Sequence, residues 1–240
     1  MIDTFIFMVL PYTALIIMLV GSVFVYKKMA YRVTALSTQL LEGKQLYFGS
    51  QFMHWGIAAL FIGHFIGFLF PSTVIAWNGL PVRLLILETT AFIMGLLFLV
   101  GLLILIYRRI THQELHAVTS NMDLVVYIIL LVQAISGIWV ALTLPWGSAW
   151  FAAVLSPYLK SLFILQPDIA AVSAMSLAVK IHISFAYILI GIIPMSRFMH
   201  FLVFPIQYVG RAFQVVIWNR DRSILRNSTG IAPEVKAKNN

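Results

Sequence analysis

The chain has 240 residues, of which 61% are hydrophobic and only 10% are charged, and its formal net charge is +8. A soluble domain carries about a quarter of its residues as charged side chains, so this composition excludes an ordinary soluble protein and indicates a polytopic membrane protein. The sequence contains no cysteine, which excludes disulfides, thiolate metal sites and iron–sulfur clusters ligated by this chain.

Five apolar runs are long enough to cross a hydrocarbon core of about 30 Å, which takes roughly 20 residues of helix. In chain order they are Thr4 to Tyr26, Ser50 to Phe70, Leu84 to Tyr107, Met122 to Leu144 and Ala178 to Phe204. The first run lacks the basic start and the cleavage site of a signal peptide, so we expect a retained helix. The sequence therefore predicts an all-α fold, an integral membrane bundle of five transmembrane helices over residues 1–208.

Lysine and arginine gather on one side of this predicted bundle. They lie between spans one and two (Lys27, Lys28, Arg32, Lys44), between spans three and four (Arg108, Arg109) and in the tail at residues 209–240. Because such residues stay cytoplasmic, we expect the N-terminus outside and the C-terminus in the cytoplasm of a multi-pass protein of the cell (inner) membrane. The net charge then reflects topology and does not call for a nucleic-acid partner. The basic tail is expected to contact cytoplasmic partner subunits.

Four histidines lie within the apolar spans, His54 and His64 on the second and His182 and His200 on the fifth. An ionisable side chain inside a membrane is costly, so four of them need a shared explanation. Their spacings correspond to about 15 Å of helix on span two and about 27 Å, five whole turns, on span five. Because these spans run in opposite directions, His54 is expected to face His200 near the cytoplasm, and His64 to face His182 nearer the outside.

Two facing imidazoles can fill both axial positions of a haem iron. The sequence therefore predicts two b-type haems, one above the other. Gly56, Gly63 and Gly67 share one side of span two, where missing side chains would let a macrocycle approach the backbone. Helix tilt and a bend at Pro194 are expected to absorb the unequal histidine spacings.

Blander interpretations of the histidines remain open at this point. A membrane histidine is often a packing hydrogen bond between helices. A histidine di-metal site is less favoured, because the spans contain no close pair of histidines. His112 and His116 do have the spacing of one helical turn, but they lie beside Glu114 in a loop and indicate a surface turn.

Three stretches of the sequence, MHWGIAALFIGHFIGF, YRRITHQELHAVTSNMD and KIHISFAYILIGIIPMSRFMHFLVFPIQYVGR, resemble the gamma subunit, the membrane cytochrome b, of respiratory nitrate reductase. The resemblance covers most of the chain and fades after about Val216. It implies that His54 and His200 ligate the haem near the cytoplasm, and that His64 and His182 ligate the distal one.

The same resemblance implies that quinol is oxidised near the distal haem and that its protons leave on the outside. Electrons would pass to an iron–sulfur beta subunit and a molybdenum-containing alpha subunit, which reduces nitrate in the cytoplasm. Gly63 and His64 match the family's quinol-site pair. Leu85 stands where the family has a lysine, so Arg83 and Glu88 are the nearest charged candidates, and Arg83 is equally well explained as an interfacial anchor.

Other basic residues have two interpretations. Arg108, Arg109 and Arg197 near the inner haem, and Lys180 near the distal haem, could contact haem propionates, because guanidinium and ammonium groups suit carboxylates. Alternatively, they are basic residues held at the membrane surface.

Three rival functions remain. A diheme cytochrome b of a sulfite, chlorate or nitrite oxidoreductase would look the same, because this chain does not touch the terminal substrate. A proton transporter using His64 and Glu88 as a relay would show no haem spectrum. A purely structural membrane anchor would keep electron transfer when the histidines are replaced.

Overall fold

The computed structural model describes residues 2–28, 38 and 41–202. Within these residues, five helices are long and apolar enough to cross a membrane, and no strand occurs. They are Ile2–Lys28, Lys44–Leu69, Pro81–Thr111, Asn121–Thr143 and Leu177–Met195. The prediction of an all-α protein with five membrane-spanning helices is confirmed. The predicted tail at residues 209–240 lies outside the described residues.

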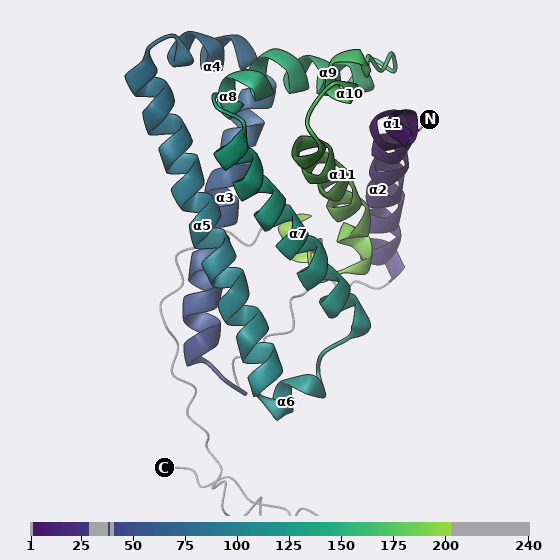
Figure 1. Cartoon of the computed structure of the whole chain (residues 1–240). Coiled ribbons are helices and arrows are strands. Elements are labelled where there is room, and N and C mark those ends of the chain that lie inside the picture. Colours follow the sequence, from purple (N-terminus) through teal and green to yellow (C-terminus); the bar gives the residue numbers. More distant parts are fainter. Residues whose placement is uncertain (1, 29–37, 39–40, 203–240) are drawn as a thin grey trace, which may run out of the picture.

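The first span consists of α1 (Ile2–Thr4), a π-helical segment η1 (Phe5–Val9) and α2 (Leu10–Lys28). Spans two to four are α3 (Lys44–Leu69), α5 (Pro81–Thr111) and α7 (Asn121–Thr143). The fifth consists of α11 (Leu177–Ile192) and the 3-10 turn η4 (Ile193–Met195). In the bundle, α3 packs on α5, α5 on α7, α7 on α11, and α11 on α2 (Figure 1).

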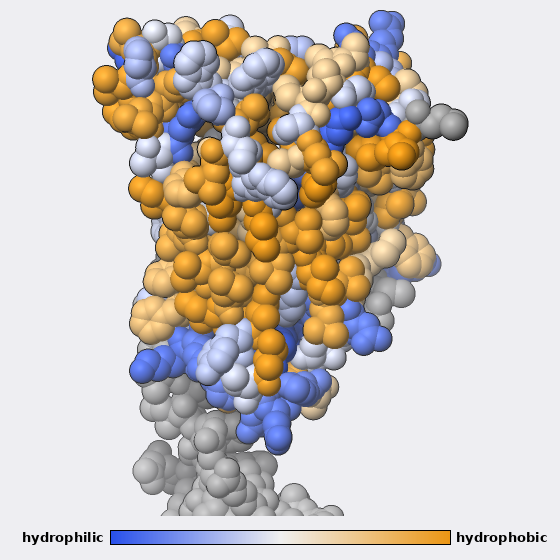
Figure 2. All heavy atoms as spheres, viewed as in Figure 1, coloured by the Kyte–Doolittle hydropathy of each residue, from blue (hydrophilic) through white to orange (hydrophobic). Residues whose placement is uncertain are grey.

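Short helices cover both ends of the bundle. One end, where α1 lies, carries an end layer of short helical segments (Figure 1). The end layer consists of α4 (Pro71–Asn78), α8 (Gly147–Trp150), the π-helical segment η3 (Phe151–Leu155), α9 (Ser156–Phe163) and α10 (Ala170–Ser173). The opposite end carries α6 (Gln113–His116). Between the two ends, Figure 2 shows a broad band of apolar side chains, as expected for a surface that faces lipid.

The predicted continuous fifth span, Ala178 to Phe204, is wrong in its last part. The α-helix ends at Ile192, Pro194 lies in the 3-10 turn, and Ser196 is extended, with φ −115° and ψ 173°. A short helix, α12 (Met199–Leu202), follows. Proline has no N–H for the helix ladder and its ring crowds the preceding turn, so the expected bend is a full break. The estimate of five whole turns between His182 and His200 therefore does not apply.

Small residues bring α3 and α5 into close contact. A Cβ added at Gly56 of α3 would lie 2.6 Å from the backbone nitrogen of Phe98 on α5. One added at Gly101 of α5 would collide with the backbone of Met53 on α3. Next to this contact, Phe98 and Leu102 are buried with Leu130 of α7. This half of the bundle therefore packs through backbones and aliphatic side chains.

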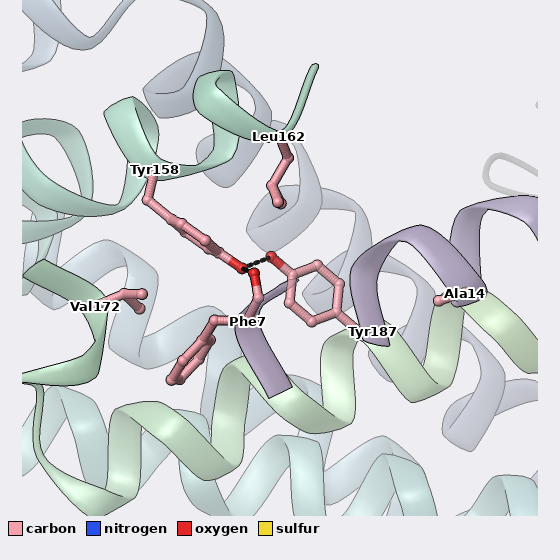
Figure 3. Close-up of a cluster of buried hydrophobic side chains, with 6 residues drawn as sticks. All are labelled: Phe7, Ala14, Tyr158, Leu162, Val172 and Tyr187. Carbon is pink, nitrogen blue, oxygen red and sulfur yellow. Dashed lines mark hydrogen bonds between the residues drawn. The ribbon is translucent and has the colours of Figure 1, made fainter. Parts of the chain in front are cut away.

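A second core joins the first and fifth spans to the end layer (Figure 3). The Tyr187 hydroxyl donates to the Tyr158 hydroxyl at 3.0 Å, which donates to the carbonyl of Phe7 at 2.8 Å. Burial raises the pKa of Tyr158 to about 12, so its hydroxyl keeps its proton at neutral pH. These bonds connect α11, α9 and η1, and they fix the end layer on the bundle.

Candidate functional site

The histidines of the spans come together in two pairs. His64 of α3 and His182 of α11 have ring centroids 6.5 Å apart, with planes at 37°. His54 of α3 and His200 of α12 have ring centroids 6.4 Å apart, with planes at 58°. Since α3 packs mainly on α5, and α11 on α7 and α2, the rings approach one another across helices that are not close neighbours. The pairing matches the one expected from antiparallel spans.

The His54–His200 pair includes a residue that lies beyond the helix break after α11. His200 lies on α12, beyond Pro194, and so it does not follow the axis of α11. The unequal spacings expected along the two helices do not prevent the pairing, because the two rings of each pair lie at nearly the same distance, with centroids 6.4 and 6.5 Å apart. Sequence periodicity had placed His182 and His200 on one helix face, and the structure separates them onto two helices.

The spacing of each pair fits one metal ion between two imidazoles. An imidazole nitrogen binds a metal at about 2.0–2.1 Å, so two bonds and two half-rings add up to roughly 6 Å between ring centres. Within residues 2–28, 38 and 41–202, no group of three or more His, Asp or Glu side chains converges to hold a metal. Each pair therefore suits a metal that brings its other ligands with it, as haem iron does.

Hydrogen bonds give three of the four rings the same proton arrangement. The Nδ1 atoms of His54, His64 and His200 lie 2.7, 2.7 and 2.6 Å from the backbone carbonyl oxygens of Ser50, Leu60 and Arg197. A carbonyl oxygen can only accept, so Nδ1 carries the proton in each neutral ring. Nε2 is then left with its lone pair, which is the arrangement of metal-binding histidines.

His182 is held differently, by side chains of α7. Its Nδ1 lies 3.1 Å from the Ser136 hydroxyl, and its Nε2 lies 3.3 Å from the side-chain nitrogen of Gln133. Gly137 leaves room for the ring, because a Cβ there would lie 2.9 Å from Cε1 of His182. Sequence reasoning missed this group. Gln133 and Ser136 are polar residues in an apolar span, the signal that drew attention to the histidines.

The glycines of α3 do not act as a set. Gly56 is used for packing on α5, and a Cβ at Gly67 would lie 2.9 Å from the ring of Phe151. Only Gly63 of the three faces open space, with nothing within 4 Å of an added Cβ. The prediction that all three open a path for a macrocycle is therefore wrong for Gly56 and Gly67. The backbone of α5 lies against Gly56, and the ring of Phe151 lies against Gly67.

Two of the predicted propionate contacts are held by carboxylates at the α6 end of the bundle. Arg108 is buried, and its Nε donates to Glu42 at 2.7 Å. Burial alone raises the pKa of Glu42, but hydrogen bonds from the Gln45 backbone and from Arg108 outweigh it, so the pKa is lowered. Arg197 donates to both oxygens of Asp123 at 2.8 and 3.1 Å.

The other two basic residues differ from each other. Lys180 binds both carboxylate oxygens of Asp3, at 3.0 and 2.9 Å. Arg109 donates from Nη1 to the Thr119 hydroxyl at 2.9 Å and lies over the ring of Tyr127. Its Nε is buried without a hydrogen-bond partner among the described residues. Of the four, Arg109 therefore has a donor, its Nε, that finds no partner within residues 2–28, 38 and 41–202.

The proposed quinol residues lie at or near the end layer. His64 is exposed, and its ring meets Phe151 edge-on, with centroids 5.2 Å apart. Arg83 is exposed and stacks over Trp77, 5.2 Å from the ring centroid. Glu88 accepts hydrogen bonds from the backbone and hydroxyl of Ser148 at 3.2 and 3.1 Å. Arg83 and Glu88 thus have partners in the end layer.

The remaining two histidines belong to the α6 end. His116 is exposed on α6, and its Nε2 lies 3.4 Å from the carbonyl of Ile110. His112 is the residue between α5 and α6. Both positions agree with the surface turn predicted for them.

Comparison with known proteins adds a family to this geometry. Residues 3–219 match the model of the nitrate reductase gamma subunit. The chain is 28% identical over 211 residues to the nitrate reductase gamma chain of Bacillus subtilis, covering 86% of this chain and 94% of that one. It is 27% identical over 222 residues to the respiratory nitrate reductase 1 gamma chain of Escherichia coli, covering 89% and 96%.

A third relative is longer than this chain. The nitrate reductase-like protein NarX of Mycobacterium tuberculosis is 28% identical over 225 residues, which are 90% of this chain but 34% of that protein. The match to the family model covers nearly the whole sequence, including the five spans and the four paired histidines. The chain therefore belongs to the nitrate reductase gamma subunit family and is a membrane subunit of nitrate reductase.

Proposed function

We propose that this chain is the quinol-oxidising, diheme cytochrome b subunit of a respiratory nitrate reductase. The observation that carries the proposal is the presence of two histidine pairs, each with ring centroids 6.4 to 6.5 Å apart. When bound, two b haems supply one-electron carriers at two depths, which suits a route for electrons from quinol outside to the cytoplasmic side.

The ligand roles follow from the pairs. His54 and His200 would hold the inner haem, and His64 and His182 the distal one. Three of these rings have Nδ1 occupied by a carbonyl and need no rearrangement to offer Nε2. At His182 the lone pair of Nε2 accepts from Gln133, so the amide of Gln133 must turn aside for a metal.

The open face beside Gly63 and His64 is the proposed quinol site. Gly63 offers space and His64 is exposed, so a flat ring can approach the distal pair from there. His64 cannot accept a proton from quinol, because Nδ1 already donates to Leu60 and Nε2 is assigned to iron. The acceptor is then water or a carboxylate of the outer end such as Glu88. Arg83 lies on the first turn of α5 and would attract the quinol oxygens from the membrane surface.

The ion pairs reduce the number of basic residues that are candidates for contacting the haem propionates. Arg109 has a buried Nε without a partner among the described residues, so it is the preferred contact of the inner haem. Arg197 and Lys180 would each bind a propionate in addition to the carboxylate that each binds now. Arg108 is assigned to the fold, because Glu42 and the neighbouring backbone take its donors.

The partners proposed for this subunit are an iron–sulfur beta subunit and a molybdenum-containing alpha subunit on the cytoplasmic side. The basic ends of α2, α3 and α5 lie at the α6 end, which the positive-inside rule assigns to the cytoplasm. A chain without cysteine cannot ligate an iron–sulfur cluster, so electrons that leave the inner pair need an acceptor on another subunit.

The test is a reduced-minus-oxidised optical spectrum of the purified complex, with haem quantified as the pyridine haemochrome. We expect two b haems per chain. Replacing His54, His64, His182 or His200 by Ala should remove or strongly perturb one haem each. His116→Ala is the matched control, because this histidine is exposed on α6, and it should keep both haems. An assembled complex without haem would refute the proposal.

A further inference from the structure

His182 differs from the other three histidines in what orients it. His54 and His64 donate to backbone carbonyls four residues earlier in α3, and His200 donates to the carbonyl of Arg197 just before α12, so no side-chain replacement removes those acceptors. His182 reaches instead to the hydroxyl of Ser136 on the neighbouring helix α7. One ligand of the four therefore depends on a side chain.

The direction of this hydrogen bond follows from the surroundings of Ser136. Ser136 is 4% exposed, and its hydroxyl donates to the carbonyl of Gln133 at 3.2 Å. With its proton used there, the oxygen accepts from Nδ1 of His182 at 3.1 Å. His182 consequently has the same proton arrangement as the other three rings, with the lone pair on Nε2.

The ring is also confined by its contact with α7. A Cβ at Gly137 would approach Cε1, Nδ1 and Nε2 of His182 to 2.9, 3.4 and 3.7 Å. The edge of the ring that carries Nδ1, Cε1 and Nε2 therefore lies against α7 at Gly137, and Ser136 is the residue of α7 that forms a hydrogen bond with its Nδ1. An imidazole held this way loses little freedom when a metal binds to it.

We propose that Ser136 is the positioning residue of the distal haem ligand, and that its hydroxyl sets both the orientation and the basicity of His182. The inference rests on the diheme function proposed above. A hydrogen bond from Nδ1–H makes the imidazole a stronger donor to iron, which favours the ferric state. Removing the acceptor should therefore raise the midpoint potential of the distal haem and leave the inner haem unchanged.

The experiment is an optical redox titration of the purified complex carrying Ser136→Ala, with electron paramagnetic resonance of the oxidised haems. We expect the ratio of oxidised to reduced distal haem at a fixed potential to fall by up to about tenfold, a rise of up to about 59 mV for a one-electron couple. The distal resonance should shift as well, because it reports the orientation of the imidazole planes. His182→Ala, which removes the distal haem, identifies which component it is.

Ser136→Cys and Ser50→Ala make the test specific. Sulfur is larger than oxygen but still a weak acceptor at the same position, so Ser136→Cys should give an intermediate shift. The Ser50 hydroxyl also lies 3.1 Å from a histidine Nδ1, that of His54, but the Ser50 carbonyl already accepts there at 2.7 Å. Ser50→Ala keeps that carbonyl and should therefore shift the inner haem less than Ser136→Ala shifts the distal one.

The possible results separate this inference from the proposed function. Two haems in the native complex, with unchanged potentials and resonances in Ser136→Ala, would overturn the role of Ser136 and leave the diheme function standing. A native complex without haem would overturn both. If Ser136→Ala loses the distal haem but retains the inner one, the positioning role is supported. If it loses both, the Ser136→Cys protein decides through its potential.

Discussion

At the scale of single residues, His200 is held through its neighbour Arg197. The carbonyl of Arg197 accepts from His200 Nδ1 at 2.6 Å, and the guanidinium of Arg197 is bound by Asp123 at the start of α7. Asp123 is itself fixed in a capping box with Ser120. Since α12 is a single turn after a helix break, this ion pair is one of the contacts that connect His200 to the rest of the bundle, together with the ring contact of Phe201 with Phe61.

We expect Asp123→Asn to weaken the inner haem and to leave the distal haem in place. The substitution removes the charge that holds Arg197, and loss of such support behind a metal ligand typically costs about 10–100-fold in affinity. Haem per chain, measured with increasing detergent washing, checks this. The control is Asp168→Asn, an exposed aspartate near the opposite end of the bundle. Loss of the distal haem instead would contradict the role assigned to Asp123.

Residue chemistry and spacing predicted the histidine pairs, but not what surrounds them. His54 with His200 and His64 with His182 follow from antiparallel helices, and the structure brings these rings together. The partners of Arg108 and Lys180 could not be predicted from the sequence, because Glu42 and Asp3 are 66 and 177 residues away in the chain. Pairs so distant in sequence are determined by tertiary packing, and hydrophobic periodicity carries no information about it.

At the scale of elements, hydropathy located every span and misjudged one end. Hydropathy measures how apolar a stretch is, and the stretch after Pro194 is apolar enough to be read as a continuation of the membrane-spanning helix. It does not register the missing N–H of proline, which is what ends α11. The helices between residues 145 and 177 were not predicted, because they are too short to show a clear hydrophobic period.

The contact between α3 and α5 provides a prediction at this scale. Gly101→Ala places a methyl group against the backbone of Met53, and neither helix backbone can yield without moving. We expect a loss of stability of about 1–3 kcal/mol, the usual cost of overpacking. Gly95→Ala on the same helix is the control, since its Cβ would meet the nearest atom at an ordinary 3.8 Å.

Thermal unfolding of the two proteins in the same detergent measures this difference. Gly101→Ala should lower the midpoint clearly, and Gly95→Ala should stay close to the native value or exceed it, because alanine favours helix over glycine. Equal midpoints for the two variants would mean that α3 and α5 are not packed through their backbones.

At the scale of the whole molecule, the orientation in the membrane determines whether the proposed function is possible. The proposed electron route starts at the pair nearer the end layer, His64 and His182, and leaves from His54 and His200. It delivers charge across the membrane only if the end layer faces outward. Two helix ends favour that orientation, because α2 and α5 carry basic residues in their last turns (Lys27, Lys28, Arg108 and Arg109) and both helices end toward the side of the bundle where α6 lies (Figure 1).

A chain without cysteine makes this orientation simple to test. Gln166→Cys places the single thiol on an exposed position of the end layer, and Glu114→Cys places it on exposed α6. In sealed right-side-out vesicles, an impermeant maleimide should label Gln166→Cys at once, and Glu114→Cys only after permeabilisation. The reverse pattern would put the proposed quinol site in the cytoplasm and would rule out outward proton release. Each variant is also the control for the other, since detergent must make both thiols reactive.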